Sequence, residues 1–420
     1  MKKYVLMMLL GCISVTLQAQ VLQSLSLDSC YVWARLNYPT IQQLQLITNS
    51  SQYAIENAAK GFYPQLSING QATYQSDVTQ VPIKLPGLNL PVISKDQYKL
   101  YGDISQTLYD GGAIKLQKDL IQANATIEKQ TIEVELYKLK ERINQIYFGI
   151  LLVNEQLLQS ELLHQDLMRG SERTRSAIAN GISLKSNADI LQAEILKLGQ
   201  RVIELKSMRK AYLDMLGLYI HRQLDEQTVL KSPASPVLLS TIKRPELLSF
   251  DYRNKLLDIQ RRQIDARSKP KIGLFVQGGY GRPALNMLNN EFDFYYIGGV
   301  RLNWSLSGLY TSKNEKTILI VNHQLLEAQK ETFLLNTNLI LQQQNAEITK
   351  LEELIKADDE IITLRNKIKN TALAQLENGV INTADYLREV NAEDQSKQTR
   401  LLHEIQLLLA RYQQQVSSGN

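Results

Sequence analysis

One stretch of the chain, from Gly112 to Ala179, constrains the fold more than any other. It contains no proline, and its only internal glycines are Gly149 and Gly170. Its apolar residues recur at alternating spacings of four and three: Ile132, Leu136, Leu139, Ile143, Ile146, Ile150, Val153 and Leu157. Such a heptad seam predicts a left-handed supercoil against a partner helix. At 1.5 Å per residue the helix would be roughly 100 Å long, far longer than an average globular helix.

The N-terminus predicts a secretory leader over Met1–Ala19, since two lysines precede a short apolar run and Leu17-Gln18-Ala19 forms a cleavage signal. A membrane anchor needs about twenty apolar residues, and this run is too short. The segment Leu9-Leu10-Gly11-Cys12 resembles a lipobox, so lipid attachment at Cys12 stays open as an alternative. After cleavage near Ala19, Cys30 is the only cysteine, which excludes an intrachain disulfide.

Charge and motif content argue against several classes of protein. The formal net charge is +5, or +3 without Lys2 and Lys3, and no basic block suggests nucleic-acid binding. The four histidines show no metal-ligand spacing: His164, His221, His323 and His403. We therefore expect no cofactor, no metal and no enzyme, and the chain offers nothing to place in an active site.

Fixed offsets show that the chain is a tandem repeat. Pro39 and Pro245 lie 206 residues apart, as do Pro64 and Pro270, whereas Asn180-Gly181 and Asn378-Gly379 lie 198 apart. The offset changes within loops and turns, but it is constant across the long helix. Surface loops tolerate insertions and paired rods do not, so the constant length indicates a mechanical requirement.

Each half has the same predicted order of helix, β-hairpin, long helix, tight turn and return helix. Ser26 or Asp28 would cap a first helix over Asp28–Lys60, and Pro245 would open its counterpart, which ends at Lys269. The predicted boundaries are a leader at 1–19, a first repeat at 20–216, a connector at 217–244 and a second repeat at 245–416. Within the repeats we expect strands at 64–76, 98–109, 270–281 and 292–306, long helices at 112–179 and 308–377, and return helices at 187–216 and 383–416.

The four predicted strands alternate between apolar and polar residues. In the first, Leu66, Ile68, Gly70, Ala72 and Tyr74 share one face, and polar side chains occupy the positions between them. A single segment of this kind is typical of a soluble sheet packed on a core. Four such strands with aromatic ends are instead what an outer-membrane barrel requires. Four strands cannot close a barrel, whose minimum is about eight, so copies must pool their strands, two giving eight or three giving twelve.

The order and spacing of short motifs resemble the TolC family of outer-membrane efflux proteins over essentially the whole mature chain. They are the leader, Tyr63-Pro64-Gln65-Leu66, Leu108-Tyr109-Asp110-Gly111-Gly112 and the two Asn-Gly…Asp turns. The second half departs from the family pattern at Trp304–Leu309, where an aromatic-Asp/Gly-Gly sequence is usual. The resemblance predicts a mainly α chain with a membrane β-barrel part.

The resemblance implies a homotrimer in which a twelve-stranded barrel in outer-membrane lipid continues into an α-helical periplasmic tunnel. It also implies a passive exit duct for efflux or type I secretion, opened by an inner-membrane transporter with a periplasmic adaptor. The alternative is a periplasmic coiled-coil adaptor or tether without a pore, although adaptors need β-rich flanking modules that this chain lacks.

In the family, residues after the second turn line the periplasmic aperture, and the resemblance carries this role to Asp385, with Arg388 three residues later. Asp189 is the matching residue after the first turn, which is two residues longer. The hairpins would turn at Asn180-Gly181 and Asn378-Gly379. Three aspartates at a constriction would attract cations. Alternatively, Asp189 and Asp385 cap the return helices.

Overall fold

A computed structural model describes residues 24–79, 93–239 and 241–420. The predicted leader and Cys12 lie outside these ranges. The chain divides into two compact units. The hairpin unit comprises Met1–Ile41, Glu135–Arg244 and Thr337–Asn420, and the sheet unit comprises Gln42–Val134 and Pro245–Asn336. No helix in the described ranges combines the length and apolarity needed to cross a membrane.

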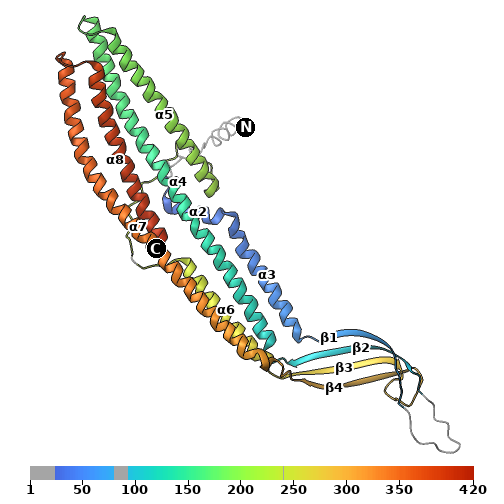
Figure 1. Ribbon diagram of the computed structural model, residues 1–420. Coiled ribbons are helices and arrows are strands. Elements are labelled where there is room, and N and C mark those ends of the chain that lie inside the picture. The colour runs from blue at the N-terminus through green and yellow to red at the C-terminus, as the bar shows by residue number, and fades with distance from the viewer. Residues whose placement is uncertain (1–23, 80–92, 240) are drawn as a thin grey trace, which may run out of the picture. The chain divides into compact units, whose positions relative to one another are not determined.

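The elements follow the predicted order, and they confirm a mainly helical chain with one four-stranded antiparallel sheet (Figure 1). The helices are α2 (Leu27–Asn37), α3 (Gln42–Ala59), α4 (Ala113–Ala179), α5 (Lys185–Ile220), α6 (Pro245–Arg267), α7 (Gly308–Glu377) and α8 (Thr383–Ser418). The strands are β1 (Gln65–Tyr74), β2 (Asp96–Tyr109), β3 (Lys271–Arg282) and β4 (Asp293–Asn303).

The first helix is not continuous, and the prediction of one helix over Asp28–Lys60 is wrong. α2 begins after Ser26, whose side chain accepts a hydrogen bond from the Ser29 backbone N–H. It ends at Asn37, because Pro39 restricts Tyr38 to an extended conformation (φ −68°, ψ 127°). A short 3-10 turn over Pro39–Ile41 then leads into α3.

The start of α4 depends on the Asp110-Gly111-Gly112 sequence. The Asp110 carboxylate is buried and accepts hydrogen bonds from the backbone N–H groups of Gly112 and Ile114, at 2.8 and 2.5 Å. Gly111 has φ +72°, and a Cβ there would lie 2.8 Å from the Lys269 Cβ, so only glycine fits. In the second half, where this motif is missing, the Trp304 indole N–H donates to the Ser268 carbonyl oxygen at 2.9 Å.

The predicted heptad seam of α4 is buried from Ile132 to Val153, with Ile143 and Ile150 at 0% exposure. Gly149 serves this packing, because a Cβ there would lie 3.0 Å from the Tyr212 ring of α5. Arg209, which interrupts the seam of α5, has a structural role: it donates to the carbonyl oxygens of Glu226 and Thr228 in the connector. The connector starts at His221, because α5 continues to Ile220 with Leu216 and Ile220 buried.

The hairpin unit contains two antiparallel helix pairs, α4 with α5 and α7 with α8 (Figure 1). One apolar cluster joins α4 and α5 to α8: Leu163, Leu167, Leu191, Leu198, Leu387 and Val390. A second cluster joins α7 to α8 through Ile348, Leu351 and Ala410. The first cluster therefore joins the two helix pairs, and α8 contributes to both clusters.

Candidate functional site

Both helix pairs reverse at a glycine with positive φ, +73° at Gly181 and +70° at Gly379. The backbone N–H of Ile182 donates to the Ala177 carbonyl oxygen, and that of Gly181 donates to Ile178. The same pattern recurs at Val380 and Gly379. These are Schellman motifs, in which a left-handed residue satisfies the last carbonyls of a helix. The structure thus places Asn180-Gly181 and Asn378-Gly379 at the tips of the two hairpins.

Asp385 and Arg388 lie in the first turns of α8. The cap of this helix is Asn382, whose side chain accepts from the Asp385 backbone N–H at 2.9 Å. Asp385 is therefore a first-turn carboxylate, where the helix dipole favours negative charge, and the alternative that it is the N-cap residue is wrong. Its Oδ1 lies 2.6 Å from Nη2 of Arg388, whose side chain is 72% exposed.

Asp189 has a different setting. α5 begins at Lys185 with Leu184 as a cap residue that makes no side-chain hydrogen bond. Asp189 is thus beyond the first turn and exposed, so the alternative that it caps α5 is wrong. The two turns have equal length, residues 180–184 and 378–382, so the expectation of a longer first turn is wrong. Asp189 instead lies two residues further into its helix than Asp385. The structure gives Asp189 and Asp385 non-equivalent positions on their helices.

A cavity of about 770 Å³ lies between the two hairpin tips. Arg173 of α4 and Glu377 of α7 both contribute to its wall and form an ion pair with a 3.3 Å N···O distance. Tyr386 also borders the cavity, and burial raises its pKa above the ordinary value of a tyrosine. The tips are thus joined by an exposed ion pair, which contributes little stability alone.

The sheet has one apolar face that no described residue of its unit covers. Its strands lie in the order β1-β2-β3-β4, so β1 and β4 each have one edge without a neighbouring strand (Figure 1). In register, Leu66, Ile104, Val276 and Gly298 form one row across the sheet. The exposed apolar side chains of this face include Leu66, Ile68, Leu100, Val276, Phe294, Tyr296 and Val300. Phe294 and Tyr296 are 81% and 83% exposed, an arrangement that water would disfavour.

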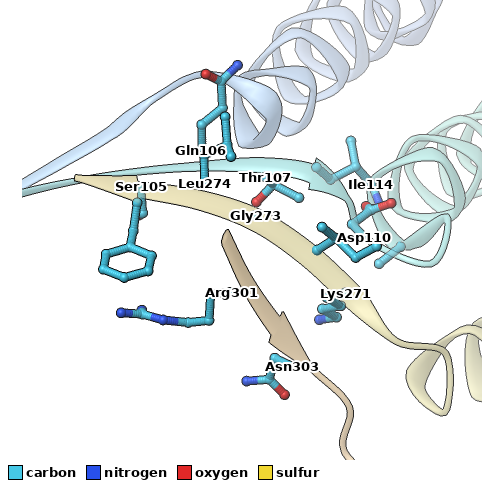
Figure 2. A pocket seen from close by; sticks show the side chains of 13 residues that line it. Ser105, Gln106, Thr107, Asp110, Ile114, Lys271, Gly273, Leu274, Arg301 and Asn303 are labelled. Carbon is cyan, nitrogen blue, oxygen red and sulfur yellow. The ribbon is translucent and has the colours of Figure 1, made fainter. Parts of the chain in front are cut away.

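The opposite face of the sheet is polar, and near the helices it forms a hollow of about 300 Å³ (Figure 2). Lys271 and Arg301 extend from neighbouring strands into this region, while Gln106 points to the other face (Figure 2). Thr107, Gly273 and Arg301 form one cross-strand row, and Lys271 pairs with Asn303 in the next. The predicted alternation of faces is thus present, with Gln106 on the apolar face and Phe275 on the polar face as exceptions.

Among the described residues, no group of three or more histidine, cysteine, aspartate or glutamate side chains has a geometry suited to a metal ion. Cys30 is buried at the start of the chain's described part, and burial raises the pKa of its thiol to about 12. A thiol with so high a pKa is a poor nucleophile.

Comparison with solved structures decides the fold. CusC, described as forming a transmembrane channel, superposes with a TM-score of 0.67 at 13% identity, over 93% of this chain and 91% of CusC. The outer-membrane protein VceC of Vibrio cholerae gives 0.64 at 12% identity, over 94% and 96% of the two chains. The outer-membrane channel MtrE of Neisseria gonorrhoeae gives 0.61 at 15%, over 94% and 89%. No family model and no curated protein matches the chain.

The chain has the TolC-family fold.

Within this TolC-type fold, the structure brings together a set of charged side chains that the sequence did not predict. Glu393 of α8 is 3% exposed, and its carboxylate lies 2.6 Å from Nζ of Lys369 and 3.0 Å from Nζ of Lys397. Asn366 donates to the same carboxylate at 3.1 Å. Burial alone would raise the pKa of Glu393, but hydrogen bonds and the charges of both lysines outweigh it and hold this pKa below 4.5.

A second buried carboxylate links the two hairpins of the TolC-type fold. Asp394 accepts from Gln159 of α4 at 3.2 Å and pairs with Arg201 of α5 at 3.1 Å. These partners are separated by 235 and 193 residues in sequence. Sequence reasoning missed them because charged residues on a long helix look like a solvated face. Only the register of two paired helices shows which of them are buried.

Proposed function

We propose that this chain is the outer-membrane exit duct of a tripartite efflux or type I secretion system. The observation that carries the proposal is the open sheet with an exposed apolar face and two unpaired edges. Lipid can cover such a face, but lipid excludes unsatisfied strand edges. A membrane location therefore requires closure with strands from other copies of the chain.

Three copies would supply twelve strands, in line with the trimer that the family resemblance implies. Exposed apolar side chains on the helices support association between copies. On α7, Ile318, Val321 and Leu325 recur at spacings of three and four, and each is about half exposed. Such a short seam is suited to a partner helix, and a neighbouring copy supplies one. Closed in this way, the strands form a barrel and the helices form a periplasmic tunnel.

The duct is passive, and an inner-membrane transporter with a periplasmic adaptor drives export and opens it. We place the periplasmic aperture at the hairpin tips, turned by Asn180-Gly181 and Asn378-Gly379. Asp385, Arg388 and Asp189 line it in this proposal. The Asp385–Arg388 ion pair supports a role at the aperture, since it fixes an exposed carboxylate beside the second tip.

Wild-type and Asp385→Ala proteins reconstituted in planar bilayers test this proposal. We expect wild-type protein to form cation-preferring channels. Removing Asp385 deletes one negative charge per copy and leaves Arg388 without its partner. The K⁺/Cl⁻ permeability ratio should therefore fall by about threefold or more. The helix start survives because Asn382 supplies the cap.

The matched control is Asp214→Ala, which removes an exposed carboxylate from α5 and should leave the permeability ratio unchanged. Wild-type protein that never forms channels would refute the duct. Channels whose conductance and selectivity are the same with and without Asp385 would remove only this residue from the aperture.

A further inference from the structure

The hollow at the foot of the sheet holds two cationic side chains, Lys271 and Arg301, that form no ion pair with a carboxylate of the described residues. Within the described residues, the Arg301 side chain makes one cation–π contact, in which its guanidinium lies 4.5 Å from the centroid of the Phe275 ring. The side-chain ammonium of Lys271 forms no ion pair or hydrogen bond with any residue of the described ranges. Both cations therefore have their donors free for a ligand.

Two carboxylates on this part of the sheet, Asp110 and Asp103, form no ion pair with the two cations. Asp110 borders the hollow, but its two oxygens accept from the backbone N–H groups that open α4. Asp103 shares the polar face and pairs in register with Gln277. It lies four residues along the strand from the row of Arg301, or about 13 Å at 3.3 Å per residue. Screening by salt weakens attraction over such a distance.

The register brings the two cations within reach of one ligand. Arg301 is level with Gly273, and Lys271 is two residues further along the same strand. Diagonal neighbours of this kind have Cα atoms about 7–8 Å apart, which long side chains span. Thr107 and Ser105 add hydroxyl groups, and Asn303 adds an amide. Figure 2 shows Arg301, Lys271 and Asn303 on the same side of the sheet.

We propose that this hollow binds carboxylate or phosphate groups, and that three copies of it form a basic ring that holds anionic cargo inside the duct, whereas Asp385 sets the preference for small cations. Arginine binds such groups through paired N–H donors, and lysine adds a second charge. This inference rests on the proposed function, because a closed lumen is what brings the copies into a ring. A water-filled lumen lined by one sign of charge concentrates ions of the other.

The test measures block of single-channel current by tripolyphosphate in planar bilayers. The wild type is compared with a double variant, Lys271→Gln with Arg301→Gln. Loss of two charged hydrogen-bonding groups per copy should raise the half-blocking concentration by about tenfold or more. The matched control is Lys99→Gln, which removes a cation from the same face at the other end of the sheet. It should change the half-blocking concentration by less than about twofold.

Wild-type channels that conduct but are not blocked would overturn the basic ring and leave the duct standing. Equal block in the double variant and the wild type would overturn it as well. If the wild type forms no channel, the proposed function and this inference both fall. Should the double variant fail to assemble, the wild type still decides: block that weakens as salt rises supports the site, and block independent of salt contradicts it.

Discussion

Val276→Lys should nearly abolish outer-membrane assembly, whereas Gln277→Lys should not. The two residues are neighbours on the central strand β3 but lie on opposite faces of the sheet. A lysine on the lipid face of a barrel costs about 2–4 kcal/mol near the bilayer midplane, and each copy contributes one. Gln277 pairs in register with Asp103, so a lysine there gains an opposite charge as its neighbour.

The measurement is the amount of trimer in outer-membrane fractions of a sucrose gradient. We expect at least about a tenfold loss for Val276→Lys and less than about a twofold change for Gln277→Lys. A sheet that faces water predicts little loss for Val276→Lys as well, because Val276 is 53% exposed and a charged residue at an exposed position is tolerated. Equal amounts of both variants would therefore contradict the lipid-facing assignment.

Glu393→Gln should loosen the contact between α7 and α8. The substitution keeps the shape of the side chain but leaves Lys369, whose side chain is 16% exposed, without its carboxylate. Breaking a buried ion pair costs about 3–5 kcal/mol. Hydrogen exchange of the α8 amides around residue 393 should accelerate by about 100-fold or more.

The matched control is Glu389→Gln, one turn earlier on α8. Its partner Arg365 is 41% exposed, and the pair contributes at most about 1 kcal/mol.

Because the folded-state pKa of Glu393 lies below the ordinary value of a glutamate, its stabilising effect is complete at neutral pH and is lost as pH falls through that lowered pKa. The difference between wild type and Glu393→Gln should shrink accordingly in acid. A constant difference would show that charge is not the cause.

Periodicity predicted the parts of the fold that depend on local pattern. The heptads of α4 and the alternation of β1 and β3 each specify one buried or one apolar face, and the structure shows those faces. The break between α2 and α3 at Pro39 was also visible in the sequence, because proline restricts the residue before it. The prediction of one continuous helix over Asp28–Lys60 failed because it did not take account of this restriction by Pro39.

The candidate sites depended on longer-range information. Asp110 was noticed as a motif, but its buried capping of α4 follows from three-dimensional contacts. Some residues can be assigned a role only from contacts with other helices or strands. They are Glu393, Asp394, Lys271 and Arg301. No spacing within one segment encodes such a register. The aperture residues Asp385, Arg388 and Asp189 stay predictions that rest on the family resemblance.

Site-directed spin labelling of β3 tests the central claim most directly, namely that one face of the sheet contacts lipid and the other faces water. Single variants Leu274→Cys, Phe275→Cys, Val276→Cys and Gln277→Cys are labelled in a chain with Cys12→Ala and Cys30→Ala, and reconstituted in liposomes. Labels at 274 and 276 should collide with oxygen, which concentrates in lipid, and labels at 275 and 277 should collide with a water-soluble nickel complex. Equal access of the nickel complex to all four positions would contradict a membrane-embedded sheet.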